Sequence, residues 1–283
     1  MPDVAYVNGR VGPLAAARVS VLDRGFLFAD GVYEVLRTYD GVPFQLEAHL
    51  RRLRQSLRGL RLPLPLPLPR LQALILDLLR RSGYADARVY LQVTRGAAPR
   101  RQHAFPRGIR PTLVVFVERV VEDGPRRRGL AVVTMPDPRW RYCHLKTLAL
   151  LPNVLARQAA VRAGADEAVL LGPGGVVREG STSNVFMVRG RVLRTHPLGA
   201  EILPGVSRQV TLAVARAEGL DVREEPFRLA ALLRADEVLL SSTALEVAPV
   251  VRVDGKRIGG GKPGPVAAAL QTRFRARTRT RSS

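Results

Sequence analysis

The spacing of apolar residues in the first half of the chain predicts both helices and strands. Leucines recur every three or four residues over residues 47–60, which places them on one face of a helix. A second amphipathic helix is predicted over residues 71–81 and ends at Gly83. Between the two helices, residues 62–69 alternate leucine with proline and predict an extended connector, because proline is not tolerated inside a helix. Residues 23–31 are rich in turn-forming residues. Strands are expected at residues 4–7, 10–11, 18–22, 32–39, 88–94 and 112–117.

A break in the apolar pattern divides the chain into two domains. Residues 122–129 contain no aliphatic or aromatic residue and no periodicity, which is typical of a linker. They separate an N-terminal domain of residues 1–121 from a C-terminal domain of residues 130–275. The basic tail, residues 276–283, is predicted to be disordered. In the C-terminal domain we expect strands at residues 130–134, 167–171, 185–188, 191–194 and 237–240, a last hairpin at 250–258, and helices at 151–163, 203–218, 229–233 and 265–274.

Lysine is scarce in this chain, and one lysine stands out by its position. Lysine and arginine together number 45, but lysine occurs only at Lys146, Lys256 and Lys262. Lys256 follows an Asp-Gly turn and Lys262 lies in a glycine-rich stretch, whereas Lys146 lies between a strand-like and a helix-like run. Arginine cannot lose its proton at useful pH or form a Schiff base, whereas lysine can do both. Lys146 is therefore a candidate for amine chemistry, with a lone structural lysine as the alternative.

Length and composition exclude several classes of protein. The 283 residues permit two domains, and a hydrophobic content of 46% is ordinary for a globular protein. No apolar run approaches the roughly 20 residues needed to span a bilayer, and the first residues lack the pattern of a signal peptide. The single cysteine, Cys143, excludes an intrachain disulfide framework and a multi-cysteine zinc site. These features predict a soluble, cytoplasmic protein without a membrane partner or a metal site.

The formal net charge of +21 raises the question of an anionic partner. The arginines are spread along the chain, with local clusters at residues 126–128 and 273–281. Aromatic residues make up only 5%, and no zinc-finger spacing or aromatic RNA-binding motif is present. The pattern favours compositional bias over a specific nucleic-acid partner.

An aldehyde cofactor on Lys146 would need further groups, and the sequence offers a candidate for each. A helix starting near Gly205 and Ser207 can cradle a phosphate, although an ordinary helix start is the alternative. Glu179 can pair with a protonated ring nitrogen, or it can be an exposed turn residue. Arg52 can point inward to an anion, or it can belong to a solvated face. Further candidates for binding phosphate or carboxylate are Ser242 and Thr243, which can equally form a turn, and residues 100–103, which can be simple surface charge.

The order and spacing of a series of short motifs are together highly specific, although each motif alone is weak. The chain resembles the fold-type IV pyridoxal-phosphate aminotransferases, and within them the D-amino-acid aminotransferases, from about residue 4 to residue 275. The resemblance implies an α+β subunit with a smaller N-terminal α/β domain and a larger C-terminal pseudo-barrel α/β domain. The matching motifs are Asp23-Arg24-Gly25, Gly31-Val32-Tyr33-Glu34-Val35, His49-Leu50-Arg51-Arg52-Leu53, Val93-Thr94-Arg95-Gly96, His144-Leu145-Lys146, Glu179-Gly180-Ser181-Thr182-Ser183-Asn184-Val185-Phe186, Thr195-His196-Pro197, Ile202-Leu203-Pro204-Gly205-Val206 and Ser242-Thr243.

The resemblance implies a role for each candidate residue. Lys146 is implied to form the Schiff base with pyridoxal 5′-phosphate, and Glu179 to pair with the pyridine nitrogen. Tyr33 is implied to lie near the cofactor and the substrate carboxylate. The implied phosphate ligands are Arg52, Val206, Ser207 and Thr243, where the family often has threonine in place of Ser207.

A carboxylate trap and a dimer are also implied. Arg101 and His103 have the Arg-x-His spacing of the D-specific branch, in which the neighbouring subunit donates these residues. An obligate homodimer, with its active site near the subunit interface, is therefore expected. The loop of residues 99–103 is one residue longer than usual, so that either Arg100 or Arg101 occupies the arginine position.

The activity implied is a ping-pong transamination between a D-amino acid, such as D-alanine or D-glutamate, and a 2-oxo acid. A branched-chain L-amino-acid aminotransferase is the nearest alternative, and an aminodeoxychorismate lyase is a third. Residues 32–35 and the Arg-x-His loop favour the D-specific branch.

Overall fold

The computed structural model describes residues 3–120 and 128–279, which belong to two compact units. The first unit combines Met1–Glu122 with Leu145–Ala149, and the second combines Asp123–His144 with Leu150–Thr280. The linker expected at residues 122–129 lies mostly outside the described residues. Leu145–Ala149 were expected in the C-terminal domain, but they pack with the first unit because their backbone hydrogen-bonds to an N-terminal strand.

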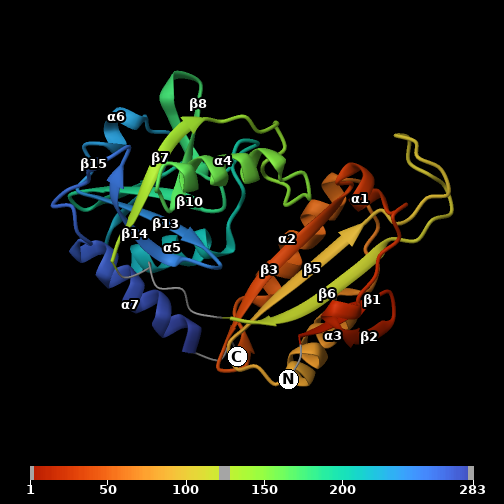
Figure 1. The fold of residues 1–283 in the computed structure, drawn as a ribbon. Coiled ribbons are helices and arrows are strands. Elements are labelled where there is room, and N and C mark those ends of the chain that lie inside the picture. The colour runs from red at the N-terminus through yellow and green to blue at the C-terminus, as the bar shows by residue number, and fades with distance from the viewer. Residues whose placement is uncertain (1–2, 121–127, 280–283) are drawn as a thin grey trace. The chain divides into compact units, whose positions relative to one another are not determined.

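The first unit is an antiparallel sheet with two long helices packed on it (Figure 1). The strand order is β2-β1-β6-β5-β3-β4. The strands are β1 (Val4–Val7), β2 (Arg10–Pro13), β3 (Gly31–Tyr39), β4 (Val42–Pro43), β5 (Ala87–Thr94) and β6 (Thr112–Arg119). The helices are η1 (Leu14–Ala16), α1 (Arg24–Phe28), α2 (Leu46–Gly59) and α3 (Leu68–Ser82).

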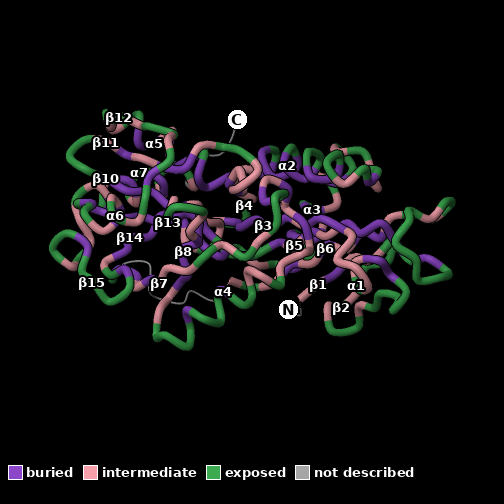
Figure 2. Tube along the Cα trace, turned by 90° about the horizontal axis from the view of Figure 1, so that it is seen from above, coloured by how far each residue is buried: buried purple, intermediate pink, exposed green. Residues whose placement is uncertain are grey.

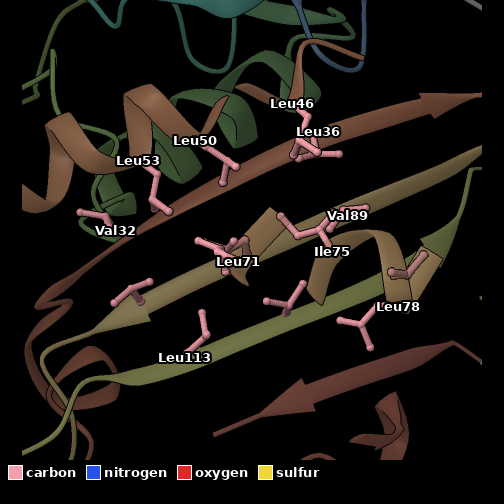
Figure 3. Packing of buried hydrophobic residues seen from close by; sticks show 14 of the residues in the cluster. Val32, Leu36, Leu46, Leu50, Leu53, Leu71, Ile75, Leu78, Val89 and Leu113 are labelled. Atoms are coloured by element: carbon pink, nitrogen blue, oxygen red, sulfur yellow. The ribbon is translucent and has the colours of Figure 1, made fainter. Parts of the chain in front are cut away.

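Alternation of side chains along the strands builds the core of this unit. Every second residue of a strand points to the same face of the sheet, so Val32 and Leu36 of β3 both face the helices. Leu50 and Leu53 of α2 meet them there (Figure 3). Glu34 lies between the two apolar residues of β3 and is also buried, a position in which a carboxylate requires partners. The rest of this layer includes Leu71, Ile75, Leu78, Val89 and Leu113.

One expectation for residues 18–31 was wrong, and one short helix there was not predicted. Residues 18–22 form no strand and are exposed, because no neighbouring strand offers them a ladder of hydrogen bonds. The turn-rich segment contains the short helix α1, whose N-cap Asp23 accepts a hydrogen bond of 2.8 Å from the Gly25 N–H. A helix of this length has no apolar period to detect.

The extended connector expected at residues 62–69 ends earlier than expected. Helix α3 begins at Leu68 and has proline in its first turn, where proline is tolerated.

The second unit is a larger sheet whose strands close on themselves. Its order is β12-β11-β10-β13-β14-β7-β8-β9, with β15 beside β14, and β9 also pairs with β10 through Glu179 and Asn184. The strands are β7 (Leu130–Pro136), β8 (Glu167–Gly172), β9 (Val176–Gly180), β10 (Asn184–Arg189), β11 (Val192–Thr195), β12 (Asp221–Glu224), β13 (Glu237–Ser242), β14 (Glu246–Val253) and β15 (Lys256–Arg257). The helices are α4 (Leu151–Arg162), η2 (Pro173–Gly175), α5 (Val206–Ala217), α6 (Leu229–Leu232) and α7 (Pro265–Arg279).

Strands and the inner faces of helices carry most of the buried positions, whereas turns and loops are mainly exposed (Figure 2). Helix α7 continues through residues that were expected to be disordered. Leu270 and Phe274 anchor it in the interior, and the arginine and alanine residues that follow favour helix, so only residues 280–283 of the predicted tail lie outside the described chain. Within the described residues, no helix has both the length and the apolar character to cross a membrane.

Candidate active site

Backbone pairing holds Lys146 against β3. Thr147 forms an antiparallel bridge with Val32, and the N–H of Tyr33 donates to the carbonyl of Lys146 at 3.0 Å. On the other side of the bridge, the N–H of Leu148 donates to the carbonyl of Gly31 at 3.0 Å. In this register Lys146 lies opposite Tyr33, and opposite residues of an antiparallel pair project to the same face.

The register brings the amine to the ring of Tyr33. The Nζ atom of Lys146 lies 4.3 Å from the centroid of that ring. The backbone N–H of Lys146 donates to the hydroxyl of Ser56 on α2 at 3.0 Å, which fixes the other side of the segment. Tyr33 itself stacks on Tyr90 with centroids 5.7 Å apart. The structure thus brings together two predicted residues, Lys146 and Tyr33.

Arg52 lies on the buried face of α2 and forms a charged cluster with two residues that sequence reasoning did not assign. Its Nε and Nη2 donate to the two carboxylate oxygens of Glu34 at 2.8 and 2.7 Å. The Nδ1 atom of His49 lies 2.8 Å from Glu34 Oε2. Two-point pairing of this kind fixes the plane of a guanidinium. The alternative that Arg52 is solvated is wrong, because only 7% of the residue is exposed.

The electrostatics of this cluster favour an ionised Glu34 and a neutral His49. Burial alone raises the pKa of Glu34, but the charge of Arg52 and its hydrogen bonds outweigh burial and lower the pKa from 4.5 to about 2. Burial lowers the pKa of His49, and Glu34 opposes this effect only in part. A charged residue within an otherwise apolar strand face was the signal that could have revealed the cluster.

Replacing Glu34 with glutamine is expected to destabilise the protein by about 3 kcal/mol or more at pH 7, because it leaves a buried arginine without its carboxylate. A carboxyl whose pKa is lower in the folded state stabilises the fold at pH values above its pKa in the unfolded chain. The contribution of Glu34 should therefore be present above pH 4.5 and be lost as pH falls toward 2. Urea unfolding of parent and Glu34→Gln between pH 2.5 and 7 measures it.

The matched control is Glu118→Gln, which removes a carboxylate from a more exposed pair with Arg88 in the same sheet. That change should cost less than about 1 kcal/mol. An equal loss for both variants, or a difference that does not shrink toward acidic pH, would contradict the role assigned to Glu34.

Glu179 lies on β9 and is held by three donors. Its Oε2 accepts hydrogen bonds of 3.0 Å from Asn184 Nδ2 and 3.0 Å from the Leu203 N–H. Its Oε1 pairs closely with Arg139, which in turn makes a two-point pair of 2.9 and 2.9 Å with Asp137. Glu179 is only 4% exposed, so the alternative of an exposed turn residue is wrong.

Burial raises the pKa of Glu179 to about 7, even though the Arg139 charge and the hydrogen bonds oppose the effect. A carboxylate with such a raised pKa gains from a cationic partner that stabilises its ionised form. A protonated ring nitrogen is a partner of that kind. Arg139 was not assigned by sequence reasoning, since its role depends on a contact with a residue 40 positions away.

The three hydroxyl residues that follow Glu179 and Gly180 bond to another buried carboxylate and not to Glu179. Ser181, Thr182 and Ser183 all direct their hydroxyls to the buried carboxylate of Glu167, at 2.8 Å for Thr182 and 3.2 Å for Ser183. Asn153 donates to the carbonyl of Ser181 at 2.7 Å. This network stabilises the turn that joins β9 to β10.

The start of α5 has the properties of an anion cradle. Gly205 is its N-cap and supplies no side chain to the first N–H groups of the helix, and Val206 and Ser207 are buried. A Cβ atom on Gly205 would lie 2.1 Å from Asn184 Oδ1, so glycine allows the helix start to approach β10. In the ladder of β10 and β13, Asn184 lies opposite Ser241.

A further hydroxyl belongs to β13, opposite Asn184. The Oγ atom of Ser241 is buried and makes no hydrogen bond within the described part of the chain. Thr243, predicted to bind the phosphate, follows directly after β13 and is half-buried. Ser241 was missed because its burial depends on the pairing of β13 with β10.

Each unit, taken by itself, contains groups of the kinds that pyridoxal phosphate requires. The second unit contains a buried helix start without a side-chain cap, a buried unpartnered hydroxyl at Ser241, and the buried carboxylate of Glu179. The first unit supplies the amine of Lys146 and the guanidinium of Arg52. Within the described residues, no group of histidine, cysteine and acidic side chains is arranged to hold a metal ion.

The predicted carboxylate-binding residues lie on the exposed loop between β5 and β6. The guanidinium of Arg101 lies 4.8 Å from the centroid of the Phe28 ring. The ring of His103 contacts the same Phe28 edge to face, with centroids 5.3 Å apart. The structure thus brings Arg101 and His103 together on one aromatic side chain of α1.

Comparison with known proteins assigns the chain to a family. The amino-transferase class IV model matches residues 31–253, and the chain therefore belongs to the class IV aminotransferases. A D-alanine aminotransferase of Staphylococcus haemolyticus is 38% identical over 282 residues, which cover 98% of this chain and 99% of the relative. The predicted family and the transferase class are confirmed.

Solved structures agree with this assignment. The branched-chain amino acid aminotransferase of Escherichia coli has a TM-score of 0.92 and 26% identity, over 98% of this chain and 94% of that one. A hypothetical aminotransferase of Mycobacterium tuberculosis, solved in a PLP-bound form, has a TM-score of 0.87 and 27% identity, over 98% and 99%. The predicted α+β, fold-type IV architecture is thereby confirmed.

Proposed function

We propose that this protein transfers an amino group between a D-amino acid, D-alanine or D-glutamate, and a 2-oxo acid in a ping-pong reaction that depends on pyridoxal phosphate. The observation that carries the proposal is the 38% identity to a D-alanine aminotransferase over nearly the full length of both chains. The branched-chain enzyme of Escherichia coli shares the fold at 26% identity, so the fold alone does not separate the two activities.

Lys146 is the base in this proposal. Pyridoxal phosphate supplies an aldehyde that captures amino groups and a ring that accepts the electron pair of the Cα–H bond. The neutral amine of Lys146 takes the proton from Cα of the amino acid. The backbone pairing with β3 and the bond to Ser56 hold the lysine segment in place.

Glu179 and the anion cradle hold the cofactor. The Glu179 carboxylate would accept a hydrogen bond from a protonated ring nitrogen, and Asn184 and the Leu203 N–H keep the carboxylate in position. The phosphate would be bound by Arg52 of the first unit and, in the second unit, by the N–H groups of Val206 and Ser207 and the hydroxyls of Ser207 and Thr243. The bidentate bond to Glu34 supports this role, because it presents Arg52 in one orientation.

The substrate carboxylate is bound by Tyr33, Arg101 and His103. We assign the arginine role to Arg101 over Arg100, because Arg101 and His103 share the Phe28 contact. We also propose that the protein is a homodimer in which the loop of one protomer serves the site of the other. Size-exclusion chromatography with light scattering tests this, and a monomer that retains full activity would contradict it.

A substrate panel tests the activity. The holoenzyme with D-alanine and 2-oxoglutarate should form pyruvate, followed with lactate dehydrogenase, and D-glutamate with pyruvate should run the reverse exchange. Turnover of D-alanine should exceed that of L-leucine by at least about 100-fold. A site that pairs its polar groups with a D-amino acid leaves some of these groups unpaired when an L-amino acid binds. Strong turnover of L-leucine with none of D-alanine would instead identify a branched-chain enzyme.

A further inference from the structure

The loop that carries Arg101 and His103 is long and has no regular structure. It connects β5 to β6 over residues 95–111, a length at which ordered loops are usually functional. Gly96 has φ of +103°, and a Cβ there would lie 1.9 Å from the Arg110 carbonyl oxygen, so the two ends of the loop meet closely. The ends are thus fixed by backbone contacts, and the tip with its binding residues needs a separate support.

Arg24 supplies that support. It belongs to the motif Asp23-Arg24-Gly25, which the cofactor and substrate assignments leave unexplained, and it is only 3% exposed. Its Nη1 donates to the carbonyl of Gln102 at 2.5 Å and to that of Ala104 at 3.4 Å, and its Nη2 donates to the carbonyl of His103 at 3.0 Å. Three successive carbonyls at the loop tip therefore share one guanidinium.

Asp30 fixes the guanidinium and the start of the loop together. Its carboxylate accepts a hydrogen bond of 2.7 Å from Arg24 Nε, and bonds of 2.8 and 3.0 Å from Arg95. Burial raises the pKa of Asp30, but Arg95 and Arg24 outweigh burial and lower it, so the carboxylate remains ionised. Arg95 also donates to the carbonyls of Leu60 and Arg61 at the end of α2, at 2.9 and 3.1 Å.

Phe28 carries the contact from α1 to the side chains of the loop tip. The guanidinium of Arg24 lies 4.9 Å from the centroid of the Phe28 ring, and that of Arg101 lies 4.8 Å from it. His103 meets the same ring at 5.3 Å. One short helix thus holds the backbone of the tip through Arg24 and its two binding side chains through Phe28.

We propose that Arg24 is a positioning residue that holds Arg101 and His103 in the geometry that binds the substrate carboxylate. The inference rests on the proposed function and adds a residue that touches neither substrate nor cofactor. A rigid fork with five donors suits three carbonyls and a carboxylate at once, whereas a lysine ammonium in its place has only three donors.

Steady-state kinetics of the holoenzyme test the proposal, with D-alanine varied at saturating 2-oxoglutarate. Arg24→Met should raise KM for D-alanine by roughly 10- to 100-fold, because a loop displaced by about 1 Å loses binding of this order. Its kcat should stay within about threefold of the parent, since the amine and the cofactor site are unchanged. Arg24→Lys keeps the charge but not the forked guanidinium, so its KM should lie between those of the parent and Arg24→Met.

A double-mutant cycle shows whether Arg24 acts through the loop. In an Arg101→Ala background, Arg24→Met should raise KM by a smaller factor than it does in the parent, because one of the two groups that it positions is absent. The matched control is Arg18→Met, which removes an exposed arginine that also donates to two backbone carbonyls. This control should leave both KM and kcat unchanged. Additive effects of Arg24→Met and Arg101→Ala would overturn the proposal.

Two further measurements test the role of Arg24 if Arg24→Met folds poorly. They also distinguish failure of this proposal from failure of the proposed function. Phe28→Leu, which removes the ring but no ion pair, should also raise KM with little change in kcat, by about tenfold. Hydrogen exchange of the amides of residues 97–105 should accelerate in Arg24→Met regardless of turnover. No turnover of D-alanine by the parent would refute the proposed function alone. Unchanged exchange, or an unchanged KM in both variants, would refute the role of Arg24 alone.

Discussion

Replacing Lys146 with alanine is expected to lower the transamination of D-alanine with 2-oxoglutarate by about 10⁴-fold, which is the upper range for loss of a general base. The amine is the group proposed to take the Cα proton, and Tyr33, whose ring centroid is 4.3 Å from Nζ, presents its ring face to it. A stopped-flow or coupled assay of the parent and Lys146→Ala measures the loss.

The fold of Lys146→Ala should stay intact, because the backbone of Lys146 makes the contacts that hold the segment. Its carbonyl accepts from the Tyr33 N–H and its N–H donates to Ser56. The melting temperature should therefore remain within a few degrees of the parent. Lys256→Ala and Lys262→Ala, which change the two exposed lysines, are the matched controls and should keep full activity.

Two outcomes would contradict the role of Lys146. One is turnover near the parent level in Lys146→Ala. The other is covalent labelling of a different peptide after borohydride treatment of the holoenzyme. We expect mass spectrometry to find the cofactor on the peptide that contains Lys146. Partial recovery of Lys146→Ala by added methylamine would support the amine as the missing group.

Glu179→Gln is expected to reduce kcat by about 10²- to 10³-fold, which is typical for loss of one preorganised electrostatic partner. An amide cannot stabilise a protonated ring nitrogen as a carboxylate does, so the ring becomes a poorer acceptor of the Cα electron pair. The amide keeps the size of the side chain, and Arg139 keeps its two-point pair with Asp137. Glu225→Gln is the control, since Glu225 forms a more exposed pair with Arg194.

The cofactor-free protein gives an independent test of Glu179 through its pH dependence. Burial raises the pKa of Glu179 from 4.5 to about 7, so the folded state holds this proton more tightly than the unfolded chain does. A raised pKa contributes stability that is present below pH 4.5 and is lost as pH rises through 7. The free energy of unfolding of the parent, relative to Glu179→Gln, should therefore fall between pH 4.5 and 7. A difference that grows with pH in this range would contradict the environment described for Glu179.

Local patterns predicted most of the elements and failed where pairing or burial is long-range. The helix of residues 47–60 was predicted to within a residue or two, because its leucine period results from packing on one face. The strand at residues 18–22 was wrong, and β12 (Asp221–Glu224) was missed. Both depend on whether a neighbouring strand is present, which composition does not reveal.

The candidate site divides in the same way. Lys146, Glu179 and Arg52 were predicted from residue type and motif. The partners that hold them, such as Glu34 for Arg52 and Arg139 for Glu179, emerged only from contacts across the fold. Arg24 belonged to a motif already noted, but its bonds to the loop tip join residues 78 to 80 positions apart.

By itself, the sequence determined the family, the candidate reactive groups and the segments with strong periodicity, because these depend on residue identity and on short spacing. Only the tertiary structure decided that the segment around Lys146 pairs with the start of β3, that Glu179 is buried, and that Arg24 hydrogen-bonds to a distant loop. The physical reason is that burial and backbone pairing between distant residues set the pKa of a carboxyl and the orientation of a guanidinium.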